Sequence, residues 1–413
     1  MSQVVTHESW FTRLGGSIKG VLCGFVLFAV SFPILFMNEG RAVKTAKALE
    51  EGESAVVEAS IEAVDSANEG KFVHLVGRAT TDAVLEDDLF GVSVNSIRLT
   101  RHVETLQWQE KQERETRKKL GGGTETVTTY SYVQEWFPKL INSSRFHEAT
   151  THQNPTDIPF QQLTKETSDV FVGAHRLPKS LIQQITTTEP IEVELEHVQK
   201  EWAEGLRSYT DADSNLNGFY WSRSSDTDSK IGDVRILFAA TRPTEVSIMA
   251  QQTRDTFTPF IAKNGRQLNM LTIGTATSEQ MIATAAAENS MWTWILRAVG
   301  TIMMFAGITL VARPLSVLAD VFPPVGTVVE MGTGLVAVLV AGAFSLATIS
   351  FAWLFYRPLI GVPMLLAGIG LIAFLVTKLV PRSEPAKTEE QLFVDRPFGS
   401  EGTQQPSNNS LGV

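Results

Sequence analysis

Four long apolar stretches interrupt an otherwise polar chain, one near its start and three near its end. They cover residues 18–37, 291–310, 331–355 and 359–377. Each reaches or approaches the roughly 20 apolar residues that a helix needs to cross a hydrocarbon core of about 30 Å. The pattern therefore predicts four transmembrane helices.

The first stretch shares one feature with a signal peptide, because Arg13 and Lys19 lie at its start. The apolar run is too long for the apolar region of a signal peptide, and no small-x-small cleavage site follows it. The chain continues directly into the polar sequence NEGRAVKTAKALEEG. We therefore interpret the stretch as a retained membrane anchor.

A polar region, residues 38–290, separates the first stretch from the second. With four spans both termini lie on one side, and the flanks on that side carry six basic residues against four on the other. This bias weakly favours cytosolic termini. The sequence predicts a cytosolic N-terminus at 1–17, a large domain at 38–290 on the lumenal or periplasmic side, and a disordered cytosolic tail at 381–413.

Alternating and β-branched runs indicate strands throughout the polar region, and turn residues such as Gly121-Gly122-Gly123 separate them. We expect strands at 56–64, 71–80, 92–110, 125–137, 191–198, 234–241 and 244–251. We expect helices at 41–51, 178–185 and 281–288. The predicted fold class is α+β, with four transmembrane helices that carry a β-rich, mostly antiparallel domain outside the membrane.

Composition restricts the function. The net charge of −10 and the isoelectric point near 5.3 argue against nucleic acid as a partner, because phosphate binding needs a basic surface. The single cysteine, Cys23, lies inside the first apolar stretch, so the chain forms no intrachain disulfide.

Two short patterns resemble metal sites and fail on spacing. His147-Glu148 and His152 have one residue too many for a zinc-protease helix, so the second histidine turns about 100° away from the first. The segment from Asp213 to Gly218 matches half of a calcium loop, but Ser224 occupies the position of the required glutamate. We predict no metal and no cofactor.

A candidate polar network consists of His74, His102 and Glu104. The last two share one face of a predicted strand, where an acid and a base could exchange a proton. A hydrogen-bonded cross-strand network is the commoner use of such residues. We therefore predict no catalytic residue, and we keep a membrane-bound enzyme or ligand-binding sensor with a cleft near these residues as the alternative function.

The apolar stretches contain few polar positions. Arg297 lies about six residues into the second stretch, within reach of the interface or of a neighbouring helix, so an ion path is not required. Ala337, Ala341 and Ser345 form one four-residue row in the third stretch. Such a row lets helices approach closely, within the chain or between chains.

Basic and aromatic residues mark two predicted membrane interfaces. Arg41, Lys44 and Lys47 lie on overlapping faces of the helix that follows the first stretch, where they could bind anionic headgroups. The alternative is a simple solvated linker helix. Tyr356 and Arg357 suit the headgroup layer at the turn before the last stretch.

Several segments along nearly the whole chain resemble the LUMA (transmembrane protein 43) family. They are NEGRAVKTAKALEEG, NEGKFVHLVG, IRLTRHVETLQWQE, YSYVQEW, INSSRF with HQNP, IGDVRILF, NSMWTWILRA and WLFYRPL. The stretches 160–209 and beyond 381 depart from the family pattern. The resemblance implies a four-span protein of the endoplasmic reticulum and inner nuclear membrane in animals, with bacterial relatives in which the inner membrane is the expected location.

The resemblance implies a function as a self-associating organiser of membrane complexes that interacts with lamins and emerin-like proteins. We therefore predict a non-enzymatic membrane scaffold. Its expected partners are membrane lipids, further copies of itself and other membrane or envelope proteins.

Overall fold

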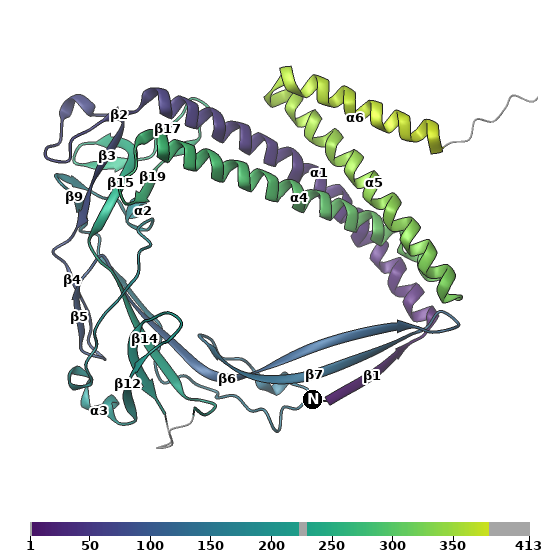
Figure 1. Ribbon diagram of the computed structural model, residues 1–413, viewed down its shortest axis with the longest axis horizontal. Helices are drawn as coiled ribbons and strands as arrows, with labels where there is room; N and C mark the ends of the chain where they lie inside the picture. Colours follow the sequence, from purple (N-terminus) through teal and green to yellow (C-terminus); the bar gives the residue numbers. More distant parts are fainter. Residues whose placement is uncertain (1, 223–228, 380–413) are drawn as a thin grey trace, which may run out of the picture.

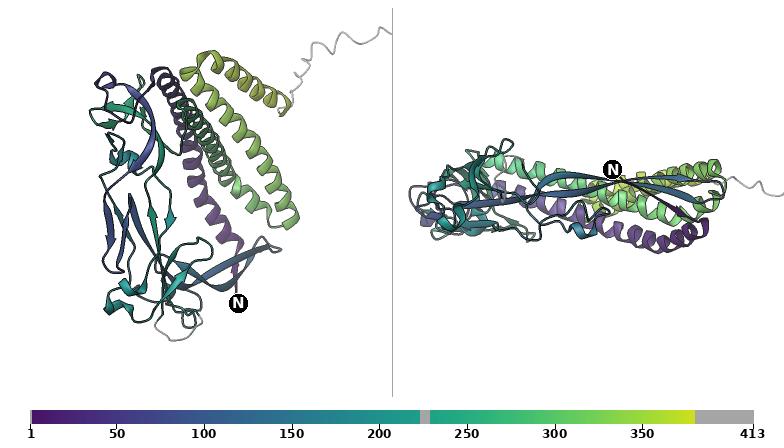
Figure 2. Two further views of the ribbon diagram at one scale, coloured as in Figure 1. Left: turned by 60° about the vertical axis from the view of Figure 1, so that its left-hand side comes forward. Right: turned by 90° about the horizontal axis from the view of Figure 1, so that it is seen from below.

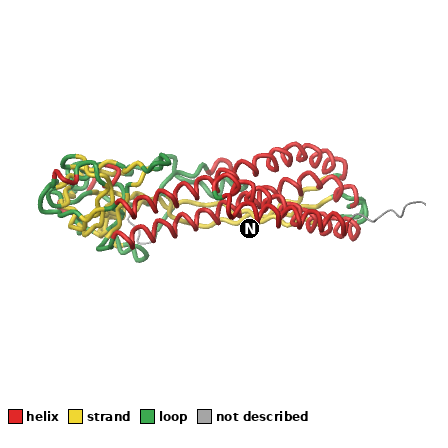
Figure 3. The backbone as a smooth tube through the Cα atoms, turned by 90° about the horizontal axis from the view of Figure 1, so that it is seen from above, coloured by secondary structure: helices red, strands yellow, loops and turns green. Residues whose placement is uncertain are grey.

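The computed structural model describes residues 2–222 and 229–379, so the predicted tail at 381–413 lies outside the described residues. A β-rich domain lies at one end of the molecule. Long helices and a long β-hairpin leave this domain separately and meet again at the opposite end (Figure 1). Seen from above, the strands of the hairpin run below the helices over most of their length (Figure 3).

The first helix is longer than the sequence predicts. The predicted span and the predicted helix at 41–51 form one continuous helix, α1 (Trp10–Ala55), which has 46 residues and is about 69 Å long. The predicted helix at 281–288 likewise continues into the second span as α4 (Ser278–Ala319). Both helices therefore extend from the apolar region into the domain without a break.

Two further helices follow at the C-terminal end, α5 (Pro323–Tyr356) and α6 (Pro358–Leu379). Among the described residues, α1, α4 and α5 are long and apolar enough to cross a membrane. Three of the four predicted spans therefore lie in helices that could cross a membrane. Helix α6 occupies the predicted fourth span, and its crossing of the membrane stays a prediction.

Local sequence explains where these helices begin. Thr277 and Gln280 form a capping box at the start of α4, in which each side chain accepts a hydrogen bond from the other residue's backbone N–H. Ser9 caps α1 through the N–H of Thr12. Pro323 is the first residue of α5, where its missing N–H costs nothing.

The larger sheet has eight strands in the order β1-β7-β6-β14-β13-β12, with β8 beside β6 and β11 beside β14. Its neighbouring strands pair antiparallel. The strands are β1 (Ser2–Glu8), β6 (Arg98–Lys118), β7 (Thr124–Phe137), β8 (Leu163–Glu166), β11 (Glu189–Pro190), β12 (Leu206–Thr210), β13 (Asn217–Trp221) and β14 (Val234–Thr241).

The second sheet has seven strands in the order β10-β9-β3-β15-β16, with β19 beside β15 and the parallel β2 beside β3. The strands are β2 (Val57–Glu58), β3 (Phe72–Thr80), β9 (Phe171–Val172), β10 (His175–Arg176), β15 (Thr244–Thr253), β16 (Thr256–Thr258) and β19 (Met270–Ile273). The predicted α+β class with an antiparallel-rich domain is confirmed.

The remaining elements are short. Two hairpins pair β4 (Val84–Asp87) with β5 (Val92–Asn95) and β17 (Phe260–Ile261) with β18 (Gln267–Leu268). The short helices are η1 (Ser66–Asn68), η2 (Ser143–Arg145), α2 (Lys179–Ile182), η3 (Leu195–His197) and α3 (Lys200–Ala203). The predicted helix at 178–185 is thus reduced to α2.

One predicted strand is wrong and another is much shorter than expected. The segment 191–198 forms no strand beyond β11 because β13 pairs with Val234–Leu237 of β14, where a longer β11 would have to lie. The segment therefore turns away and ends in η3. Of the strand predicted at 56–64, only Val57–Glu58 pairs, in parallel with β3.

Separate hydrophobic clusters stabilise the two sheets and join them to the helices. Phe90, Phe160, Phe219 and Phe238 lie in the cluster of the larger sheet. The second sheet packs through β3 and β15 against α2. A third cluster joins the second sheet to the ends of α1 and α4, through residues that include Leu49, Phe72, Met249 and Met281. This third cluster holds the domain against the helix pair.

The N-terminal segment was predicted as a separate cytosolic terminus. Its first residues instead form β1, which pairs with β7 over seven residues, from Ser2 opposite Tyr130 to Glu8 opposite Thr124. The side of the membrane on which this segment lies stays a prediction.

Paired cysteines test whether this strand pairing exists in membranes. Val5 and Val127 lie opposite each other. With Cys23 replaced by serine, we expect V5C/V127C to form a disulfide on mild oxidation of native membranes, because cross-strand Cβ atoms lie about 4.5–5.5 Å apart. The matched control V5C/V133C joins residues that are not opposite and stays reduced. A reduced V5C/V127C pair would instead support a bilayer between the N-terminus and the domain.

Candidate functional site

Three helices change between apolar and polar sequence at one level of the bundle, close to the domain. The apolar stretch of α1 ends at Met37, that of α4 begins after Ser290, and α5 ends at Tyr356. Contacts between polar side chains connect the helices at this level. We call the residues that make them the junction cluster: Asn38, Glu39, Arg41, Asn289, Thr293, Arg297 and Trp353.

Glu39 is the centre of the junction cluster and is only 1% exposed. Its Oε1 accepts a hydrogen bond from Arg297 Nε at 2.6 Å, and its Oε2 accepts one from Arg297 Nη2 at 2.9 Å. The indole Nε1 of Trp353 donates to the same Oε2. One carboxylate therefore connects α1, α4 and α5 through three charge-assisted hydrogen bonds.

Arg297 also lies against two aromatic rings. Its guanidinium carbon is 4.7 Å from the centroid of Trp294 and 5.6 Å from that of Trp353. Cation–π contacts of this kind gain strength where water is excluded. The bidentate pairing with Glu39 and the two rings together compensate for the removal of the charge from water.

Arg41 makes a second set of contacts between α1 and α4. Its Nη1 donates to Asn289 Oδ1 at 3.0 Å, and its Nη2 donates to Asn38 Oδ1 and Thr293 Oγ1, both at 3.1 Å. Asn38 Nδ2 donates to the Thr293 carbonyl at 3.0 Å. These bonds fix the rotation of the two helices relative to each other.

Gly40 permits α5 to end against α1. A Cβ atom at this position would lie 2.6 Å from the hydroxyl oxygen of Tyr356 and 2.7 Å from the adjoining ring carbon. The tyrosine ring therefore occupies the space that any larger residue at position 40 would need. The glycine of the NEGR sequence is explained by this close approach.

A cavity of about 260 Å³ opens beside the junction cluster, between α1, α4 and the end of α5. Its lining includes Glu39, Trp294, Arg297, Trp353 and Arg357. The cavity thus combines a neutralised ion pair, two indole rings and a further arginine at the level where the apolar stretches end.

The three basic residues predicted to form an interface on α1 lie in two different environments. Lys44 and Lys47 are exposed, as an interfacial or solvated helix requires. Arg41 lies at the contact with α4 and donates its hydrogen bonds to Asn289 and Thr293, so its guanidinium is used for helix packing instead of headgroup binding. Tyr356 packs on Gly40, and Arg357 lines the cavity.

The sequence pointed to Arg297 and missed its partner. Glu39 follows the first apolar stretch almost immediately, and an acidic residue at the end of one stretch could have been matched with a basic residue near the start of another. Asn289 and Trp353 were missed because only the folded chain brings them to the same level as Glu39.

The predicted small-residue row lies within the bundle. Ala337, Ala341 and Ser345 are all at most 3% exposed, and Ser345 Oγ contacts Met304 Sδ at 3.7 Å. Ala341 packs with Leu35 of α1 and Met304 of α4. In the structure this row serves contacts within the chain.

The candidate polar network of His74, His102 and Glu104 does not assemble. His74 lies in the second sheet, where Glu58 contacts Nδ1 at 2.7 Å and the Ala276 carbonyl contacts Nε2 at 2.9 Å. Glu104 lies in the larger sheet and pairs with Arg235 at 2.5 Å. His102 is exposed on β6. The three residues do not form one network because His74 lies in a different sheet from His102 and Glu104, and Glu104 pairs with Arg235, its opposite residue on β14.

The two histidines of the rejected zinc pattern stack on different tyrosines. His147 lies 4.4 Å from the Tyr130 ring centroid, and His152 lies 3.7 Å from that of Tyr132. Among the described residues, no group of three or more histidine, cysteine, aspartate or glutamate side chains could hold a metal. The acidic segment that begins at Asp213 forms a turn between β12 and β13, and Ser224 lies outside the described residues.

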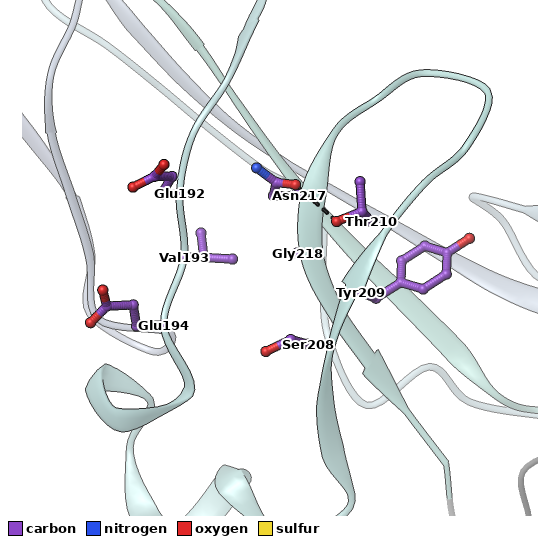
Figure 4. A pocket seen from close by; sticks show the side chains of 8 residues that line it. All are labelled: Glu192, Val193, Glu194, Ser208, Tyr209, Thr210, Asn217 and Gly218. Carbon is purple, nitrogen blue, oxygen red and sulfur yellow. Dashed lines mark hydrogen bonds between the residues drawn. The ribbon is translucent and has the colours of Figure 1, made fainter.

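A second cavity, of about 370 Å³, lies in the larger sheet between residues 192–194 and the hairpin of β12 and β13. Val193 and Ser208 point into it, whereas the carboxylates of Glu192 and Glu194 point to the far side of their segment (Figure 4). The two acids therefore do not converge on a bound molecule in this cavity.

The opposite end of the helices carries a second ionic cluster, which we call the distal lock: Arg13, Lys118, Asp320 and Glu330. Asp320, 1% exposed, accepts hydrogen bonds from Arg13 Nη2 at 2.6 Å and Lys118 Nζ at 2.9 Å. Lys118 also contacts Glu330 at 2.7 Å. Burial raises the pKa of Asp320, but the bonds from Lys118 and Arg13 outweigh it and lower the pKa overall.

The distal lock attaches the tip of the β6–β7 hairpin to the helices. Arg13 also donates to the Gly122 carbonyl, the N–H of Gly121 donates to the Val321 carbonyl at 3.1 Å, and Trp10 Nε1 donates to Val317 at 2.8 Å. Seen from below, the hairpin reaches along the helices to this end (Figure 2). The domain therefore contacts both ends of the helix bundle.

Comparison with known proteins gives a consistent result. The family model described as Transmembrane protein 43 matches residues 105–358. The human protein named Transmembrane protein 43 is 33% identical over 384 residues, which cover 90% of this chain and 93% of the human one. The mouse protein is 32% identical over 400 residues, covering 94% and 96%.

A more distant relative and the solved structures complete the comparison. The Drosophila melanogaster protein named Transmembrane protein 43 homolog is 25% identical over 371 residues, covering 87% of this chain and 94% of the fly one. No solved structure matches the chain. With a family model over more than half of its residues and relatives above 30% identity along nearly all of it, the chain belongs to the transmembrane protein 43 family.

Proposed function

We propose that this protein is a non-enzymatic membrane scaffold with four membrane-crossing helices, which self-associates and holds other membrane proteins together. The observation that carries the proposal is that the segments NEGR, NSMWTWILR and WLFYR bind one another where three helices meet. These segments supply the junction cluster, whose polar atoms bind one another across three helices. The polar side chains of these segments therefore hold α1, α4 and α5 in fixed positions, which is a structural role.

The alternative of a membrane enzyme or sensor has less support. His74 lies in a different sheet from Glu104 and contacts Glu58, whereas Glu104 pairs with Arg235. The carboxylates of Glu192 and Glu194, beside the second cavity, point away from it (Figure 4). An acid–base mechanism requires groups within hydrogen-bond reach of one bound molecule. Neither the candidate polar network nor the second cavity brings an acid and a base together in this way.

The outer face of α5 is the best candidate for self-association. Gly334, Val338 and Gly342 lie on one four-residue row, and Val338 is 55% exposed. A Cβ atom at either glycine would have no neighbour within 4 Å in the chain. Small residues beside an exposed valine would let the same face of a second copy approach closely.

A cysteine on this row tests the proposal in native membranes. With Cys23 replaced by serine, we expect V338C to form a covalent dimer on mild oxidation, because the α5 faces of two copies would meet there. The unmodified protein is a matched control, since its Cys23 is also exposed but lies on α1. It should stay monomeric under the same conditions. A monomeric V338C protein, together with monomers alone after amine crosslinking of the same membranes, would contradict self-association.

A further inference from the structure

The cavity beside the junction cluster carries an uncompensated positive charge. Glu39 and Arg297 neutralise each other, whereas the guanidinium of Arg357 is exposed and has no ion-pair or hydrogen-bond partner among residues 2–222 and 229–379. The α6 helix begins at the next residue, so the positive end of its dipole lies beside Arg357. The cavity is therefore suited to an anion.

The depth of the cavity restricts the kind of anion. It lies where the apolar stretches of α1, α4 and α5 end, and indole rings of Trp294 and Trp353 line it. Tryptophan prefers the layer between hydrocarbon and water, where lipid headgroups are found. An anion at this depth with apolar surroundings on one side is the phosphodiester of a lipid rather than a group on a soluble molecule.

The geometry also favours recognition of a phosphate over loose electrostatic attraction. A guanidinium offers planar, paired donors that match phosphate oxygens, and the rigid pairing of Arg297 with Glu39 keeps the other side of the cavity in place. Lys44 is a contrasting case, because it is exposed at a similar level on α1 but does not line the cavity.

We propose that this cavity binds the phosphodiester of a membrane phospholipid, with Arg357 as its principal ligand and the two indole rings beside the glycerol region. The site is independent of self-association, so either proposal can fail alone. It adds a specific lipid-binding site to the general membrane attachment of the chain.

Native mass spectrometry of the full-length protein in neutral detergent tests the site. The probes are phosphatidylglycerol, a diacylglycerol with the same acyl chains, and inorganic phosphate. We expect one phosphatidylglycerol to bind the unmodified protein, and R357Q to weaken this binding about tenfold or more, because glutamine cannot donate charge-assisted hydrogen bonds to the phosphate. K44Q, which removes the same charge outside the cavity, should change binding less than about twofold.

The other arms identify the ligand. R357K should bind with intermediate affinity, since it keeps the charge and loses the paired donors. Diacylglycerol should not bind, and inorganic phosphate should not displace the lipid. Equal binding by R357Q and the unmodified protein would overturn the site, as would equal losses in R357Q and K44Q. Binding of diacylglycerol, or displacement by inorganic phosphate, would overturn the assignment to a lipid phosphodiester. Circular dichroism of each variant confirms that it is folded.

Discussion

Replacing Glu39 with alanine is expected to destabilise the protein by about 3–5 kcal/mol, the cost of leaving one member of a buried ion pair without its partner. Arg297 would keep its charge beside two indole rings, with no carboxylate to accept its hydrogen bonds. Trp353 would lose its acceptor at the same time. Thermal unfolding of the purified protein in detergent, followed by circular dichroism of the helices, measures the change.

The matched control for E39A is E50A on the same helix. Glu50 is exposed, and its carboxylate has no hydrogen bond or ion pair among residues 2–222 and 229–379. Its replacement should change stability by less than about 0.5 kcal/mol, as for other surface positions. If E39A unfolds within about 1 kcal/mol of the unmodified protein, the junction cluster does not hold the helices together.

Replacing Asp320 with alanine is expected to release the hairpin tip from the helices. Two cations, Arg13 and Lys118, share this buried carboxylate, so its loss should cost about 3 kcal/mol. Hydrogen exchange of residues 117–124 is the direct measurement, because the N–H of Gly121 donates to the Val321 carbonyl across the distal lock and Gly122 is buried there. We expect faster exchange there and unchanged exchange in β14 at the centre of the sheet.

The control for D320A is E330A. Glu330 also pairs with Lys118, but its side chain is 62% exposed, so its loss should cost less than about 1 kcal/mol. Because the pKa of Asp320 is lowered in the folded protein, its contribution is complete above the unfolded pKa and is lost only as pH falls through the folded value. The lock should therefore stay closed from about pH 5 to pH 8. Equal exchange in D320A and E330A would contradict this account.

The elements that the sequence predicts well are those with strong local signals. The apolar stretches lie in α1, α4, α5 and α6, and β14 has the predicted bounds, because length and β-branched runs determine these elements locally. The strand β1 was missed, since the polar sequence of residues 2–8 becomes a strand only through its pairing with β7. The segment 191–198 failed for the converse reason, because another strand occupies its place.

Only part of the candidate site could be predicted from the sequence. Arg297 was recognised as a charge that needs explanation, but its partner lies 258 positions earlier in the chain. The periodicity of α1 places Arg41 and Lys44 on overlapping faces, and only packing against α4 distinguishes the buried arginine from the exposed lysine. Pairings of this kind depend on which helices meet, and a local pattern does not carry that information.

The central claim is that Glu39 and Arg297 act as one unit that joins α1 to α4. A double-mutant cycle of E39A, R297A and the combined variant, measured by unfolding in one detergent, tests it most directly. The account predicts that the combined variant loses less stability than the two single variants together, by at least about 2 kcal/mol, since it removes both buried charges. Additive losses, within about 0.5 kcal/mol, would contradict it.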